Sequence, residues 1–199
     1  MTQSESPRLA QVFAPDLPDD AEARARQLLA YWKQLGPEGW FAKDDAIDAH
    51  LRDHYFDLHL AAARRACDHW LTQADTGLAV VLLLDQFPRN VFRDTAHMFA
   101  TDGLAREAAQ TLIENDLVQA VDESLRLFVC LPFVHSEDIA DQDTAQALYA
   151  QWAPDNAEWA KHHREIIVRF GRFPHRNRSL GRPTLADEQE FLEAGGFTG

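Results

Sequence analysis

Two long apolar runs place the strongest constraint on the fold of this 199-residue chain. The first covers Leu78 to Leu84, and the second covers Leu125 to Val134 with one arginine inside it. No strongly alternating segment elsewhere would pair with either run as a β-strand, and a lone strand leaves its backbone polar groups unsatisfied. We therefore predict two buried helices, the second of which Pro132 should kink or end.

The other segments show the periodicity and the end signals of amphipathic helices. Asp44 and Asp45 stand where an N-cap belongs, and Gly36-Pro37 is a normal helix stop. We predict helices over 21–35, 46–71 (as one long helix or two short ones), 94–115, 138–152, 156–170 and 185–192. With no break in composition, the expected fold is all-α: antiparallel helical hairpins in a single domain over 21–199, after an irregular leader over 1–20.

Charge and cysteine usage narrow the classes of partner. The net charge of −13 repels nucleic acid and anionic membranes, so neither is an expected partner. Cys67 and Cys130 have no disulfide-framework spacing, and the first residues lack the pattern of a signal peptide, so we expect a soluble cytoplasmic protein. Against this acidic background, Lys161 to Arg182 holds seven basic residues and one acid, which suggests that the segment holds an anion or faces carboxylates.

Four segments combine polar side chains with turn chemistry: 85–90 with Arg93, 135–138, 162–165 and 171–177. Apart from 162–165, each lies where a predicted buried element ends, so the side chains can point into one pocket. The candidate ligand-binding residues are Asp85, Arg89, Asn90, Arg93, His135, Glu137, His163, Arg172, His175, Arg176 and Asn177.

These residue types suit a small anionic ligand. Arginine presents a fixed fork of donors to a carboxylate or phosphate, and histidine exchanges protons near neutral pH. If the site is catalytic, acid–base or hydrolytic chemistry fits it better than redox chemistry, because no cofactor motif is visible. A metal site built from His135, Glu137 and His163 is an alternative, but no ligand spacing is diagnostic and none is assigned.

The same motifs also fit a purely structural network. Asp138 can act as an N-cap, and Asp85 can pair with Arg89 one helical turn later. The string Phe-Pro-Arg-Asn at 87–90 returns at 173–177 with a histidine inserted, so two helix-end turns can face one another. Whether the chain is an enzyme or a binding protein stays open.

Several longer strings resemble the DUF924 family of bacterial proteins. They are Leu-Leu-Leu-Asp-Gln-Phe-Pro-Arg-Asn at 82–90, His-Ser-Glu-Asp at 135–138, His-Arg-Glu-Ile-Ile at 163–167, Phe-Gly-Arg-Phe-Pro-His-Arg-Asn at 170–177, Trp-Phe at 40–41 and Phe-Ala-Thr-Asp at 99–102. The resemblance covers roughly residues 30–197 and implies a fold similar to tetratricopeptide-like helical repeats. It supplies no catalytic residues, because the family has no established activity. Since such folds commonly present a concave surface to a peptide, a protein or peptide interaction module is the alternative function.

Overall fold

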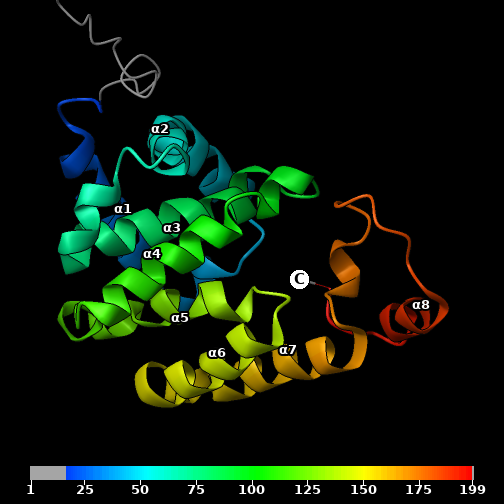
Figure 1. The fold of residues 1–199 in the computed structure, drawn as a ribbon. Helices are drawn as coiled ribbons and strands as arrows, with labels where there is room; N and C mark the ends of the chain where they lie inside the picture. The colour runs from blue at the N-terminus through cyan, green and yellow to red at the C-terminus, as the bar shows by residue number, and fades with distance from the viewer. Residues whose placement is uncertain (1–16, 199) are drawn as a thin grey trace, which may run out of the picture.

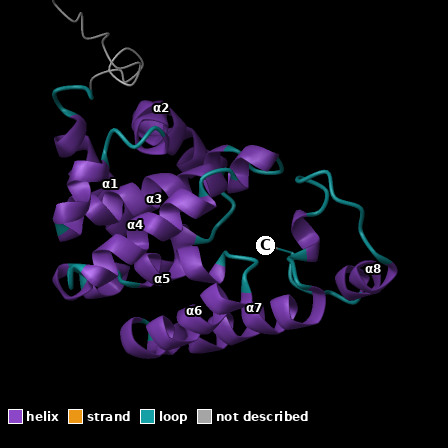
Figure 2. Cartoon of the chain, viewed as in Figure 1, coloured by secondary structure: helices purple, strands orange, loops and turns teal. Residues whose placement is uncertain are grey.

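The computed structural model describes residues 17–198, and the regular elements in this part of the chain are all helical (Figures 1 and 2). The predicted all-α class is confirmed, whereas residues 1–16 of the predicted leader lie outside the described residues. The α-helices are α1 (Ala21–Trp40), α2 (Asp45–Ala63), α3 (Ala74–Val91), α4 (Asp102–Glu114), α5 (Leu127–Val134), α6 (Ile139–Trp152), α7 (Ala157–Phe170) and α8 (Ala186–Glu193). Short 3-10 helices are η2 (Asp68–Thr72), η3 (Ala96–Phe99), η4 (Val118–Ala120), η5 (Glu123–Leu125), η6 (Pro154–Asn156) and η7 (Pro174–Arg176).

Helix α3 is the central element of the fold. It packs against α1, α2, α4 and α5, and every residue from Thr76 to Pro88 is buried. A helix surrounded on all sides is apolar on all sides, which explains why the first apolar run shows no helical period. Helix α5 is likewise buried throughout; Pro132 was predicted to kink or end it, and the helix continues through this proline and ends two residues later, at Val134.

Predicted helix ends differ from the structure mainly where the chain turns sharply. The 46–71 segment forms the two shorter helices α2 and η2, with Arg65 between them at a φ of 65°. Helix α1 is interrupted at Gly36, whose φ is 63°, and the segment 94–115 begins as η3 before regular helix starts at Asp102. The predicted cap Asp44 accepts hydrogen bonds from the backbone N–H groups of the first turn of α2.

The described chain has a large core and a small one. The large core joins α1 to α6 and the first half of α7, and the small one consists of Ile166, Ile167 and Phe173 with partly buried phenylalanines packed around it. Gly171, in the left-handed region at a φ of 69°, ends α7 and starts residues 171–198, which we call the C-terminal arm. Figure 1 shows the arm in orange and red beside α7, with its last described residues turned back toward helices α1 to α7, which we call the helical body.

Within residues 17–198, no helix has the length and apolar character that crossing a membrane requires.

Candidate functional site

The first polar motif lies inside helix α3, not after it as predicted. Pro88 has no N–H to offer the carbonyl of Leu84, a loss that normally ends a helix. The Thr101 hydroxyl donates to that carbonyl instead, at 2.5 Å, so α3 continues to Val91. As a result Asp85 and Arg89 are presented one turn apart on a rigid, buried helix.

Asp85 is the centre of a buried charge network. Its carboxylate lies 3.2 Å from the Arg89 guanidinium and 2.8 Å from His135 Nδ1, and Gln86 donates to it at 2.5 Å. Arg89 also donates to both oxygens of Asp102, at 2.8 and 3.0 Å. The i,i+4 pair expected between Asp85 and Arg89 is therefore present, with a second carboxylate from the start of α4.

These neighbours determine the charge of each group. Burial alone would raise the pKa of Asp85, but Arg89 and His135 hold it well below its ordinary value. Burial and the nearby Arg89 lower the pKa of His135. The pair is therefore a carboxylate beside a neutral imidazole, in which Nδ1–H donates to Asp85 and Nε2 carries the lone pair.

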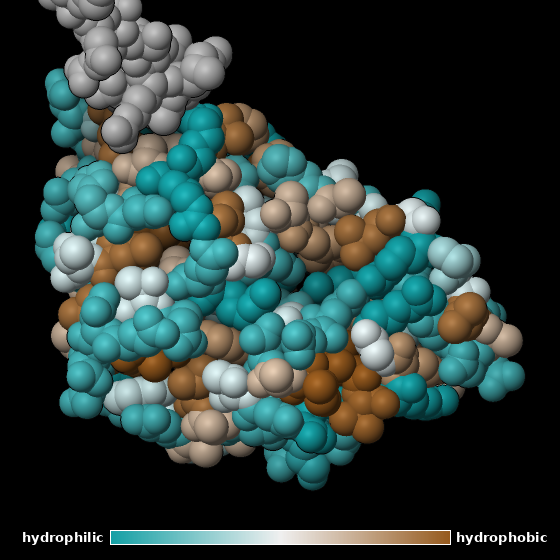
Figure 3. Space-filling view, in the orientation of Figure 1, coloured by the Kyte–Doolittle hydropathy of each residue, from teal (hydrophilic) through white to brown (hydrophobic). Residues whose placement is uncertain are grey.

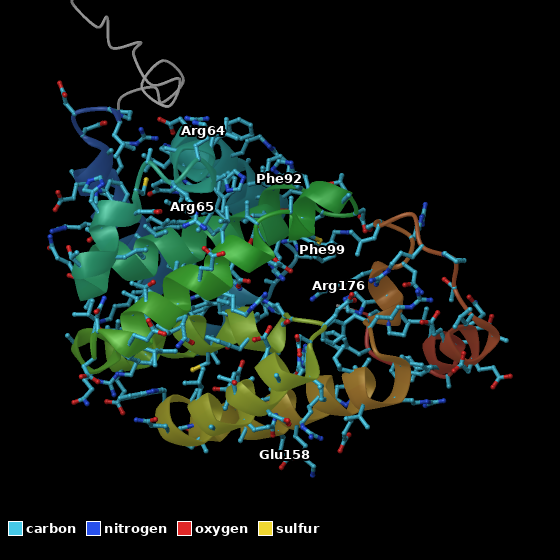
Figure 4. All side chains as sticks on the ribbon, viewed as in Figure 1. Arg64, Arg65, Phe92, Phe99, Glu158 and Arg176 are labelled. Carbon is cyan, nitrogen blue, oxygen red and sulfur yellow. The ribbon has the colours of Figure 1, made fainter. Side chains whose placement is uncertain are left out.

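Arg176, in the turn η7 of the C-terminal arm, faces this network. Its guanidinium carbon lies 4.7 Å from the centre of the Phe99 ring and 4.5 Å from that of Phe173. Figure 4 shows Arg176 and Phe99 approaching one another from the arm and the helical body. The residue is 6% exposed, its Nη1 is 3.5 Å from Asp102, and its buried Nε has no hydrogen-bond partner within residues 17–198. Burial, together with Arg89, lowers the pKa of Arg176 to about 10.

Two further histidines lie on the arm side of the network. His163 donates from Nδ1 to the carbonyl of Trp159 at 2.8 Å, as is common for a histidine inside a helix, and burial lowers its pKa to about 4. His175 has a buried Nδ1 without a partner, and burial together with Arg176 lowers its pKa to about 3. The ring of Phe197 packs against both imidazoles, with centroids 4.6 and 5.1 Å away.

The structure thus brings Asp85, Arg89, His135, His163, His175 and Arg176 into one neighbourhood, which we call the arginine–histidine cluster. The remaining candidates have their charges or amides paired elsewhere. Asn90 and Arg93 bond to Asp48 on α2, and Arg172 and Asn177 bond to Glu188 on α8. Because these partners are fixed in place, we do not assign these residues to the cluster.

Glu137 connects the body to the arm instead of facing the cluster directly. Its carboxylate accepts hydrogen bonds from the Arg182 guanidinium at 2.6 and 3.0 Å and from the Phe173 backbone N–H at 2.8 Å. Although burial would raise the pKa of Glu137, Arg182 holds it below its ordinary value. This interaction fixes the position of the turn that carries His175 and Arg176.

The repeated Phe-Pro-Arg-Asn string has a partial structural counterpart. The arginines of its two copies, Arg89 and Arg176, both contact the carboxylate of Asp102. The two copies are not equivalent helix-end turns, however, because 87–90 lies within α3 and 173–177 forms η7 and its flanks.

Several residues of the neighbourhood were not among the candidates. They are Phe99, Thr101, Asp102, Phe173, Arg182 and Phe197. The string Phe-Ala-Thr-Asp at 99–102 contains three of them and the string at 170–177 contains Phe173, so for these four residues the resemblance to a family pattern was a signal. Helical periodicity could not find them, because most of their partners lie on other elements of the chain.

Neither of two surface hollows that the structure shows is lined by the cluster. One is open, about 700 Å³, and lined by Glu137, Asp138, Ile139, Ile167, Val168 and Gly171. The other lies between α2, α3 and α4, around Arg65 and Glu107. Figure 3 shows hydrophilic surface along the seam between body and arm, and hydrophobic surface over the nearby end of α7. Within residues 17–198, no group of three or more histidine, cysteine or acidic side chains is arranged to hold a metal ion.

Comparisons with known proteins give a family without a described activity. A model of bacterial proteins of unknown function, DUF924, matches residues 28–196. A solved structure of a protein of unknown function from Agrobacterium tumefaciens is 51% identical, with a TM-score of 0.85, and the match covers 89% of this chain and 100% of that one. A search of curated proteins finds no match. The helical fold and the family match agree, and the chain belongs to the DUF924 family.

Proposed function

We propose that the arginine–histidine cluster binds a small anion between the helical body and the C-terminal arm. One observation carries the proposal: Arg176 is buried, yet among the described residues it makes a single long ionic contact. That contact, at 3.5 Å, is to a carboxylate that Arg89 already engages through two hydrogen bonds. A guanidinium has five N–H donors, and burying them without acceptors is unfavourable, so an acceptor from a ligand would complete the site.

The charges of the cluster make this binding proton-coupled. Arg89 and Arg176 are balanced by Asp85 and Asp102, and the histidines have lowered pKa values and are neutral. An added anion therefore leaves one excess negative charge, which protonation of a histidine would neutralise. Burial lowers the pKa of His163 to about 4 and that of His175 to about 3, so anion affinity should rise as the pH falls below 7 toward these values.

The Asp85–His135 pair supplies acid–base chemistry at the same place. Its 2.8 Å hydrogen bond fixes the imidazole tautomer, which leaves Nε2 as the proton acceptor. Nε2 makes no hydrogen bond among the described residues and is not one of the fully buried unpartnered atoms. If the bound molecule reacts, His135 is the residue that we expect to take or give the proton.

The test compares Arg176→Met with wild type, using Arg178→Met as the control at an exposed arginine two residues away. Isothermal titration with acetate, phosphate and sulfate at pH 5.5 should show binding that the Arg176 variant loses and the control keeps. Arg176 contributes only the 3.5 Å contact to Asp102, and Asp102 keeps its two hydrogen bonds from Arg89, so the Arg176 variant should stay folded. Equal anion binding by both variants, or unfolding of Arg176→Met alone, would point to a structural role for this arginine.

One observation favours the alternative of a protein or peptide interaction module. The open hollow at the end of α7 exposes Ile139 and Val168, which are 42% and 62% exposed. Exposed apolar side chains around a hollow are typical of peptide grooves. Selection of peptides against the wild-type protein, repeated with Val168→Asp, would support this function if the selected peptides depend on Val168.

A further inference from the structure

We propose that the anion is a monocarboxylate, held side-on by the Nε and Nη2 edge of Arg176. This proposal depends on the proposed function, because it names the ligand class of the same site. It follows from which part of the guanidinium is already occupied, and from how much charge the cluster can accept.

The first step concerns the free edge of Arg176. Phe99 and Phe173 lie within 5 Å of the guanidinium carbon, and their rings offer its N–H groups no carboxylate or carbonyl acceptor. Nη1 is the nitrogen nearest to Asp102, at 3.5 Å, whereas Nε is buried and unpartnered. The N–H groups of Nε and Nη2 point in parallel, and together they are the available pair of donors.

The second step concerns the shape of the ligand. Two parallel N–H donors match the two oxygens of a planar carboxylate in a bidentate pair. A carboxylate can accept from both donors in the plane of the guanidinium. A phosphate presents further oxygens outside that plane that need donors of their own, and the neighbouring rings of Phe99 and Phe173 offer none.

The third step concerns charge. The carboxylates of Asp85 and Asp102 already balance the two arginines of the cluster. One proton, taken up by a histidine such as His175 beside Arg176, would compensate a monoanion. A dianion such as sulfate would need two protons or would leave uncompensated charge beside Asp102, whereas inorganic phosphate is mostly a monoanion at pH 5.5 and is separated from acetate by shape. The cluster therefore favours a singly charged anion.

The experiment follows the Arg176 Nε–H resonance by NMR of protein carrying ¹⁵N-labelled arginine, during titration with acetate and, separately, with inorganic phosphate at pH 5.5. Acetate should shift this resonance downfield. Arg176→Lys keeps the charge but has no fork, and it should bind acetate at least tenfold more weakly, whereas Arg178→Lys should bind it as wild type does. Circular dichroism and thermal unfolding confirm that each variant is folded.

The outcomes separate the two proposals. If phosphate binds and acetate does not, the monocarboxylate is overturned while the anion site stands. If acetate binds without moving the Nε–H resonance, or equally well to a folded Arg176→Lys, the side-on geometry is overturned. If neither anion binds, both proposals fail.

Discussion

The buried position of Asp85 makes Asp85→Asn the most informative single change in this protein. The Asp85 side chain is 1% exposed, and it pairs with Arg89 while accepting hydrogen bonds from His135 and Gln86. Removing one partner of a buried ion pair costs about 3–5 kcal/mol. Since Arg89 keeps its bonds to Asp102, we expect the lower end, about 3 kcal/mol in the free energy of unfolding. In a chain of this size that corresponds to a fall of about 6–12 °C in Tm.

The matched control is Asp57→Asn, which removes another aspartate–arginine pair at the surface. The Asp57 side chain is 53% exposed, so the loss there should stay below about 1 kcal/mol. Urea unfolding, with an unchanged slope, measures both variants. The pKa of Asp85 is depressed by folding, so its contribution is present above the unfolded pKa of about 3.9 and is lost as the pH falls further. Equal losses for the two variants at pH 7 would refute the buried-pair argument.

Three further results are expected. The folded pKa of His163, about 4, lies below its unfolded value of about 6.5, so the stability that this histidine contributes is complete above pH 6.5. It is lost toward pH 4 by up to about 1.4 kcal/mol per pH unit. In urea unfolding, His163→Gln should flatten this slope, while the exposed His162→Gln leaves it unchanged. Gly77→Ala places a Cβ 2.5 Å from a leucine methyl carbon of α4 and should lower the unfolding free energy by about 1 kcal/mol. The Cβ of Gly103→Ala meets nothing within 4 Å, so this change should raise the unfolding free energy by up to about 1 kcal/mol. Changes of the same sign in urea unfolding would contradict this packing argument. Both cysteine thiols are buried, with pKa values raised to about 12, so a thiol reagent at pH 8 should label them only as the protein unfolds, and rapid labelling would show that they are accessible.

Local rules predicted the helices well because helices depend on neighbouring residues. The all-α class, the buried helices α3 and α5 and the cap at Asp44 all follow from periodicity and capping chemistry. The same dependence on neighbouring residues made the effect of Pro88 on helix α3 hard to predict. At Pro88 the missing backbone hydrogen bond is replaced by a hydroxyl from Thr101, thirteen residues later in the chain. No rule based on neighbouring residues includes such a partner.

In the candidate site, too, the sequence predicted local features but not contacts between distant residues. Its arginines and histidines were recognisable as chemical types, but the sequence could not tell which of them are already paired. Arg172 and Arg176 lie in the same motif, yet the first is bound by Glu188 and the second lacks a close partner. Asp102 was missed because its role depends on two arginines that lie far from it in sequence. The ligand-binding roles themselves stay predictions.

The small core around Ile166, Ile167 and Phe173 also has consequences for motion. A segment held by few buried apolar side chains opens locally at a lower free energy than the whole protein. Backbone amides of the C-terminal arm should therefore exchange with solvent deuterium before those of α3, without global unfolding. Each such opening would move Arg176 away from Asp102, so the cluster would open and close on the side of the arm. A ligand that contacts both the arm and the helical body would slow this exchange, and hydrogen-exchange mass spectrometry can detect such protection before the ligand's chemical identity is known.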